Sequence, residues 1–159
     1  MKQAGIIGQG TENRSRGFSL IELLIVIAVI AIIAALAVPS LMSSRKAAFE
    51  AAAIGYIRTW SSAQEIYYNL HSCYANDDEQ LLAAGLIGNP DPDRMGYNFS
   101  IDNPAGSQTQ WWGTASPNDP GVSGDRYFFI DQTGLIRWSV GGPANVGSPP
   151  LDSSGGLQN

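Results

Sequence analysis

The sequence predicts an α+β protein in which a long N-terminal α-helix, first transmembrane and then amphipathic, packs on a small antiparallel β-sheet head. The first observation is an apolar run over residues 18–38 that continues, after Pro39, into helical periodicity to about residue 70. The second is a set of four short strand-like segments beyond residue 94. The 159 residues therefore fit one membrane anchor and one modest domain.

The apolar run carries a single charge, Glu22. At about 1.5 Å of rise per residue, its length reaches about 31 Å, the thickness of the hydrocarbon core of a bilayer. A carboxylate at the membrane centre costs about 2.5–3.5 kcal/mol, so Glu22 requires a headgroup or a cationic partner. Arg14 and Arg16 lie directly before the run, and this charge pattern predicts an N-in, C-out orientation.

The residues around the start of the run carry a family resemblance. Residues 16–24 read RGFSLIELL, and an Ile, Val and Ala run continues them to Val38 and Pro39. Over residues 14–39 the chain resembles the N-terminus of type IV pilins and type II secretion pseudopilins. The long helix joined to a small head also looks like the architecture of that family.

The resemblance implies roles for four residues. Gly17 would be the last residue of a leader, which prepilin peptidase cuts from Phe18 before methylating the new amine of Phe18. Glu22 would be the assembly glutamate, which pairs with that amine on a neighbouring subunit. Pro39 would be the kink of the long helix. A buried pair of this kind sets register more reliably than it adds stability, because desolvation cancels much of the attraction.

The expected organisation follows from the resemblance and the composition. The function implied is a structural subunit of a type IV pilus or pseudopilus filament, with no enzymatic activity. The implied partners are prepilin peptidase, copies of the chain and other pilins, the inner-membrane assembly machinery, and the membrane before assembly. The precursor would lie in the bacterial inner membrane, and the mature chain in an extracellular pilus or periplasmic pseudopilus. The expected segments are a leader (1–17), a transmembrane and filament-core helix (18–39), the amphipathic half of the helix (40–74), the sheet head (75–140) and a Gly-, Pro- and Ser-rich tail (141–159).

Two other interpretations of the N-terminus compete. In a secretory signal, Arg14 and Arg16 would be the basic region and residues 35–37 an Ala-x-Ala cleavage site, but Glu22 near the start of the apolar region argues against it. The other is a monomeric membrane-anchored extracytoplasmic binding protein. It explains the span, but it leaves the Gly17-Phe18 pair and Glu22 without a reason.

The charge balance argues against nucleic-acid binding. Removal of residues 1–17 leaves six basic and thirteen acidic residues, a formal charge of −7. The remaining cations are dispersed among carboxylates, whereas nucleic-acid binding usually shows a basic stripe.

The cysteine and histidine content argues against an intrachain disulfide and a zinc site. Cys73 is the single cysteine, so no intrachain disulfide forms, and we expect it to be buried. His71 and Cys73 together are too few ligands for zinc. No Gly-x-Ser-x-Gly motif is present, and no cofactor or metal is expected.

The amphipathic half of the helix is predicted to cover the sheet. Its polar residues Glu50, Arg58, Gln64 and Glu65 are expected mostly on the other side of the helix. The apolar positions are Phe49, Ala52, Ala53, Tyr56, Ile57, Trp60, Ala63, Tyr67 and Leu70.

The head is predicted from local patterns. The acidic residues 76–79 cap a short helix over 79–86, and residues 131–134 form a hairpin turn with Gly134 at positive φ. Trp111 and Trp112 point to opposite faces of a strand, one into the core. The strands are expected at 95–101, 109–115, 127–130 and 135–138, with a surface loop at 115–124 and a mobile or draped tail after residue 141.

Overall fold

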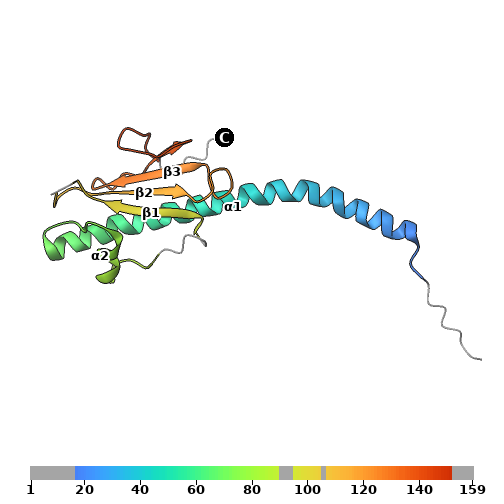
Figure 1. Cartoon of the computed structure of the whole chain (residues 1–159), viewed down its shortest axis with the longest axis horizontal. Helices are drawn as coiled ribbons and strands as arrows, with labels where there is room; N and C mark the ends of the chain where they lie inside the picture. The colour runs from blue at the N-terminus through green and yellow to red at the C-terminus, as the bar shows by residue number, and fades with distance from the viewer. Residues whose placement is uncertain (1–16, 90–94, 105–106, 152–159) are drawn as a thin grey trace, which may run out of the picture. The chain divides into compact units, whose positions relative to one another are not determined.

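The computed structural model describes residues 17–89, 95–104 and 107–151 (Figure 1). Two helices, α1 (Leu20–His71) and α2 (Asp78–Ala83), precede the strands β1 (Tyr97–Asp102), β2 (Trp112–Pro117), β3 (Arg126–Asp131) and β4 (Arg137–Val140). The chain divides into two compact units, Met1–Pro39 and Ser40–Asn159. The predicted α+β class is confirmed, because a long, N-terminally apolar helix packs on a four-stranded antiparallel sheet.

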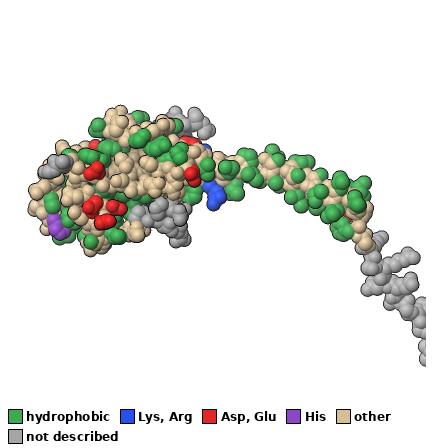
Figure 2. All heavy atoms as spheres, viewed as in Figure 1, with side chains coloured by type: hydrophobic (Ala, Val, Ile, Leu, Met, Phe, Trp, Pro, Cys, Tyr) green, Lys and Arg blue, Asp and Glu red, His purple; other side chains and the backbone are tan. Residues whose placement is uncertain are grey.

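The first unit is the apolar start of α1. Its large side chains are exposed around the whole helix, from Phe18 at 79% to Leu36 at 76% of their surface. Figure 2 shows the hydrophobic side chains covering this stretch. No residue from 17 to 39 covers them, so the surface needs lipid or other protein around it.

In the second unit, the C-terminal half of α1 supplies one side of the core. Trp60 is fully buried between Tyr56 and Phe99, with ring centroids 5.5 and 5.8 Å away in edge-on geometry. Such aromatic pairs are favoured beyond the area they bury. The predicted aromatic cover of the sheet is therefore confirmed at these positions. The buried apolar residues of this half of α1 are Ala53, Ile57, Trp60 and Ala63.

The sheet is an antiparallel meander in the order β1-β2-β3-β4. Side chains alternate along each strand, so one face packs on α1. Ile101, Gly113 and Ile130 lie in register across three strands on that face. The predicted Asp131–Gly134 turn is confirmed by the bond from Gly134 N to Asp131 O, 2.9 Å, with Gly134 at φ 72°.

Gly113 is the point where the sheet lies closest to the helix. A Cβ added there would lie 2.6 Å from the Trp60 ring. Because β2 has no side chain at this position, the indole can pack directly on the strand backbone.

We expect Gly113→Ala to destabilise the head by about 1–3 kcal/mol, since the buried indole has little room to move. Thermal unfolding of the mature chain in detergent, followed by tryptophan fluorescence, measures the change. Gly88→Ala is the matched control, because a Cβ there meets nothing within 4 Å. Equal melting temperatures for the two variants would contradict the close packing.

Several boundaries in the head differ from the predicted ones. The second strand begins at Trp112 and extends to Pro117, so Pro117 is a buried strand residue where a surface loop was expected. The short helix is Asp78–Ala83 and ends earlier than predicted, although its cap is confirmed: the Asp77 carboxylate accepts from Gln80 N at 2.8 Å. On α1, Leu70 is exposed, and so is Ala52.

The segment after β4 turns back and pairs with the β4 edge of the sheet as far as Leu151. Trp138 N donates to Pro149 O at 3.0 Å and Leu151 N to Ile136 O at 2.7 Å, and Ala144 is buried. The rest of the predicted tail lies outside the described residues. The tryptophan pair behaves as predicted, with Trp111 in the core and Trp112 half-buried on the other face.

Candidate functional site

The candidate site of the first unit is the start of α1. Ser19 precedes the helix, and its carbonyl accepts the first helical bond, from Leu23 N at 3.2 Å. The Glu22 carboxylate turns back and accepts from Ser19 N at 3.0 Å. This arrangement is one half of a capping box, in which a glutamate in the first turn satisfies a free backbone N–H.

The capping contact gives Glu22 a role within its own chain that the sequence interpretation missed. The Ser-x-x-Glu spacing at residues 19–22 is the signal that could have revealed it. The carboxylate also lies at the positive end of the helix dipole, where a negative charge is favoured. Any role of Glu22 between chains must therefore be separated from this local one.

Gly17 and Phe18 lie in the open, just before the helix. Phe18 is 79% exposed, and a Cβ added to Gly17 would meet nothing within 4 Å. The backbone of Gly17 thus needs no glycine for its own conformation or packing. A requirement for glycine here would have to come from a protein that binds or cleaves the chain at this position. Residues 1–16 of the predicted leader lie outside the described residues.

The helix that follows is long and apolar enough to cross a membrane. Among the described residues it is one candidate span, with a mean hydropathy of 3.1 over its most apolar eighteen residues. Pro39 lies inside α1. A proline in a helix interior removes one backbone donor and crowds the preceding turn. The kink expected at Pro39 stays a prediction.

Cys73 is half-buried, so the predicted full burial is wrong. The reason is its position: α1 ends at His71, and Cys73 lies in the turn beyond it. His71 instead stacks on Tyr67, with ring centroids 4.1 Å apart. In the part of the chain that the structure describes, no cluster of three metal-binding side chains occurs.

Two polar residues expected on the outer side of α1 are buried, which corrects the sequence interpretation. Glu50 forms an ion pair with Arg126, with Oε2 2.7 Å from Nε, and both side chains are 10% exposed. Its other oxygen accepts from Asp125 N at 3.0 Å and Arg126 N at 3.3 Å. The pKa of the neighbouring Tyr97 is raised, mainly because the side chain is buried and also because the Glu50 carboxylate lies nearby. The Tyr97 hydroxyl donates to Arg126 O at 2.8 Å.

Gln64 is the second buried polar residue of α1, and none of its surface is exposed. Its side-chain amide donates to Ala75 O at 3.0 Å and accepts from Ala75 N at 2.8 Å. Both backbone groups of a buried loop residue are thus satisfied by one side chain. The contact holds the turn after α1 against the helix.

A comparison with known protein families finds a match to this N-terminal segment. The family described as the prokaryotic N-terminal methylation motif matches residues 13–38. That range holds Gly17, Phe18 and Glu22, together with the apolar run as far as Val38.

Over these residues the chain is similar to proteins that carry an N-terminal methylation motif. Among curated proteins, the chain is 40% identical over 76 residues to the type IV wide pilus major component PilA4 of Thermus thermophilus. The match covers 48% of this chain and 58% of that protein. The chain is thus similar to a type IV pilin over about half of its length, in agreement with the resemblance that its N-terminal residues carry.

Proposed function

We propose that the chain is a structural subunit of a type IV pilus or pseudopilus filament. The observation that carries the proposal is an N-terminal methylation motif joined to an apolar helix that is exposed on all sides. Such a surface needs lipid before assembly and neighbouring helices afterwards. The exchange is nearly neutral in hydrophobic terms, because hydrocarbon is as apolar as leucine, so helix packing and charge pairing must supply specificity.

The proposal includes the maturation steps. Residues 1–17 act as a leader, and prepilin peptidase cuts between Gly17 and Phe18 and methylates the new amine. Before cleavage the chain lies in the inner membrane in the N-in, C-out orientation, which the basic residues before the run favour. Residues 18–39 then leave the membrane and form the filament core, with the assembly machinery and other copies of the chain as partners.

Gly17→Leu tests the cleavage step. We expect this variant to accumulate as uncut precursor, because the peptidase must accommodate the side chain before the cut. A structural effect is not expected, since Gly17 has open space around it. Mass spectrometry of the N-terminus of purified native protein, beside the variant, measures the outcome.

Each N-terminus that this experiment can find corresponds to a different interpretation of the segment. N-methylated Phe18 supports the proposal, Val38 indicates a secretory signal, and Met1 indicates an uncut anchor. Normal processing of Gly17→Leu would remove the cleavage claim. Electron microscopy of sheared surface material then separates a filament subunit from a membrane-anchored monomer, because only the former yields fibres containing the chain.

A further inference from the structure

A pocket lies on the outer face of the sheet, the face turned away from α1. Its walls come mainly from β2, β3 and the segment after β4. It has a volume of about 300 Å³, at the lower end of the range for small-molecule sites. Its apolar lining includes Trp112, Phe129 and Val146, and its polar lining includes Asp131 and Asn145. This combination of aromatic surface and a few polar groups is typical of ligand sites.

The strand register brings the indole and the carboxylate of this pocket together. Trp112 in β2 lies directly opposite Asp131 in the neighbouring strand β3 (Figure 1). Side chains opposite each other on one face have Cβ atoms about 4.5–5.5 Å apart. Phe129 precedes Asp131 by two residues, so it lies on the same face. The ladder of the sheet therefore holds these groups in place before any ligand binds.

Trp112 is a tryptophan that the fold does not use for ring packing. Over residues 17–89, 95–104 and 107–151, its indole makes no aromatic pair, no cation contact and no hydrogen bond, although it is half-buried. Each of the other three tryptophan rings contacts an aromatic ring or a guanidinium: Trp60, Trp111 and Trp138. The Trp112 indole is thus available to a ligand.

Asp131 and Asn145 each use one side-chain oxygen in the fold and keep one polar atom available. Asp131 is only 7% exposed, and its Oδ1 accepts from Thr133 N at 2.9 Å. Its Oδ2 makes no hydrogen bond with the described part of the chain and is open to solvent. Asn145 Oδ1 accepts from Gly147 N at 2.8 Å, which leaves Nδ2 free to donate. The pocket therefore offers one acceptor and one donor.

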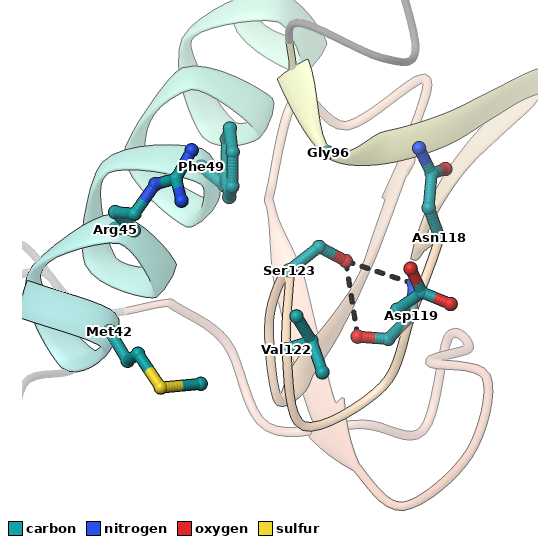
Figure 3. Close-up of a pocket in the computed structure, with 8 residues that line it drawn as sticks. All are labelled: Met42, Arg45, Phe49, Gly96, Asn118, Asp119, Val122 and Ser123. Atoms are coloured by element: carbon teal, nitrogen blue, oxygen red, sulfur yellow. Dashed lines mark hydrogen bonds between the residues drawn. The ribbon is translucent and has the colours of Figure 1, made fainter. Parts of the chain in front are cut away.

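The pocket between α1 and the loop that joins β2 to β3 offers less (Figure 3). Its Ser123 hydroxyl accepts from Asp119 N at 3.0 Å and donates to Asp119 O at 3.2 Å. Arg45 and Asp119 are both exposed there. Water already satisfies such groups, so a hydrogen bond to a ligand gains little.

We propose that the outer-face pocket binds a neutral hexopyranose, a sugar ring with hydroxyl groups on adjacent carbons. The apolar face of the ring stacks on Trp112, because its C–H groups are slightly positive and the face of an indole is negative. One hydroxyl donates to Asp131 Oδ2, and the adjacent hydroxyl accepts from Asn145 Nδ2. This binding activity goes beyond the proposed filament function and does not depend on it.

Other ligand classes fit this donor and acceptor set less well. An acidic sugar is repelled by the Asp131 carboxylate and by the net charge of −5. A cationic ligand would pair with Asp131, but it has no acceptor for the Asn145 amide.

Saturation-transfer difference NMR of methyl β-galactoside and methyl α-glucoside with the full-length chain tests the inference. The chain is kept in octaethylene glycol dodecyl ether, a detergent that contains neither a sugar nor a cation. We expect a Kd on the order of 1 mM for at least one glycoside, as the size of a single ring allows. Trp112→Ala should weaken binding at least about tenfold. Asp131→Asn should weaken it about fivefold, because a neutral hydrogen bond replaces a charge-assisted one, while the amide oxygen can still accept from Thr133 N.

Tyr127→Ala is the matched control, because Tyr127 is a half-buried aromatic residue of β3 that does not line the pocket. Thermal unfolding checks that each variant is folded, and Asp131→Asn alone decides the test if Trp112→Ala is not. No transfer to either glycoside above that of detergent alone would overturn the inference, and so would an equal loss in Tyr127→Ala and in the pocket variants. Tighter binding of choline or glucuronate than of both glycosides would overturn it in favour of a cation or an anion site.

Discussion

Glu22→Ala is expected to leave cleavage between Gly17 and Phe18 intact and to lower the amount of the chain in fibres at least about tenfold. A loss of that size corresponds to about 1.4 kcal/mol per subunit contact. The physical reason is the amine that the proposed cleavage would expose at Phe18, just before the positive end of the helix dipole. Without a carboxylate nearby, that cation enters the apolar filament core unpaired.

The structure shows that this experiment needs a second variant. Glu22 also accepts a hydrogen bond from Ser19 N at 3.0 Å, so alanine removes a helix cap together with the charge. Glu22→Gln keeps an oxygen that can accept the same bond but removes the charge, because glutamine also serves in capping boxes. If pairing with Phe18 drives assembly, both variants fail. If capping is the main role, Glu22→Gln assembles normally.

The measurement compares precursor, mature chain and fibre fractions for each variant. Immunoblots of whole cells give the cleaved fraction, and sheared fibres give the incorporated fraction. Normal fibre yield from both variants would refute the pairing mechanism. A block in cleavage would show instead that Glu22 acts at the peptidase.

The N-terminal segment could be predicted from the sequence because its signals are local. An apolar run, a charge within it and the residues before it are neighbours along the chain, and their meaning depends on the membrane rather than on distant contacts. The cap between Ser19 and Glu22 was equally local and was missed, although its three-residue spacing is a known signal.

The polar residues on α1 could not be placed in the same way. Periodicity assigns Glu50 and Gln64 to the outer side because it counts polar residues as solvent-facing. Their burial depends on partners far away in sequence, Arg126 in β3 for Glu50 and the Ala75 backbone for Gln64. The start of β2 differs from the predicted start for a related reason. Its register is set by the pairing of Trp112 with Asp102 and Asp131.

Glu50→Ala is expected to destabilise the head by about 3–5 kcal/mol, because it removes one partner of a buried ion pair, the carboxylate 2.7 Å from Arg126 Nε. The variant also removes the acceptor of two backbone N–H groups, those of Asp125 and Arg126. Urea unfolding of the mature chain in detergent measures the change. Tryptophan fluorescence is a suitable signal, because all four tryptophans lie in the second unit.

The matched control is Lys46→Ala, one turn earlier on the same helix. Lys46 pairs with Asp125 at 3.1 Å, but the Asp125 side chain is 53% exposed, and exposed pairs contribute about 0–1 kcal/mol. Its effect should therefore be much smaller than that of Glu50→Ala.

Glu50→Met combined with Arg126→Met separates the loss of one member of the ion pair from a loss of packing. Arg126 lies over the Phe128 and Trp138 rings, 5.5 and 5.7 Å from their centroids, so a long apolar side chain can occupy the same place. Replacement of a buried ion pair by apolar residues of similar volume is often nearly neutral. The double variant should therefore be more stable than Glu50→Ala. If it is less stable than the single variant, the buried pair itself contributes net stability, and the cost of Glu50→Ala does not come from removing one member of the pair alone.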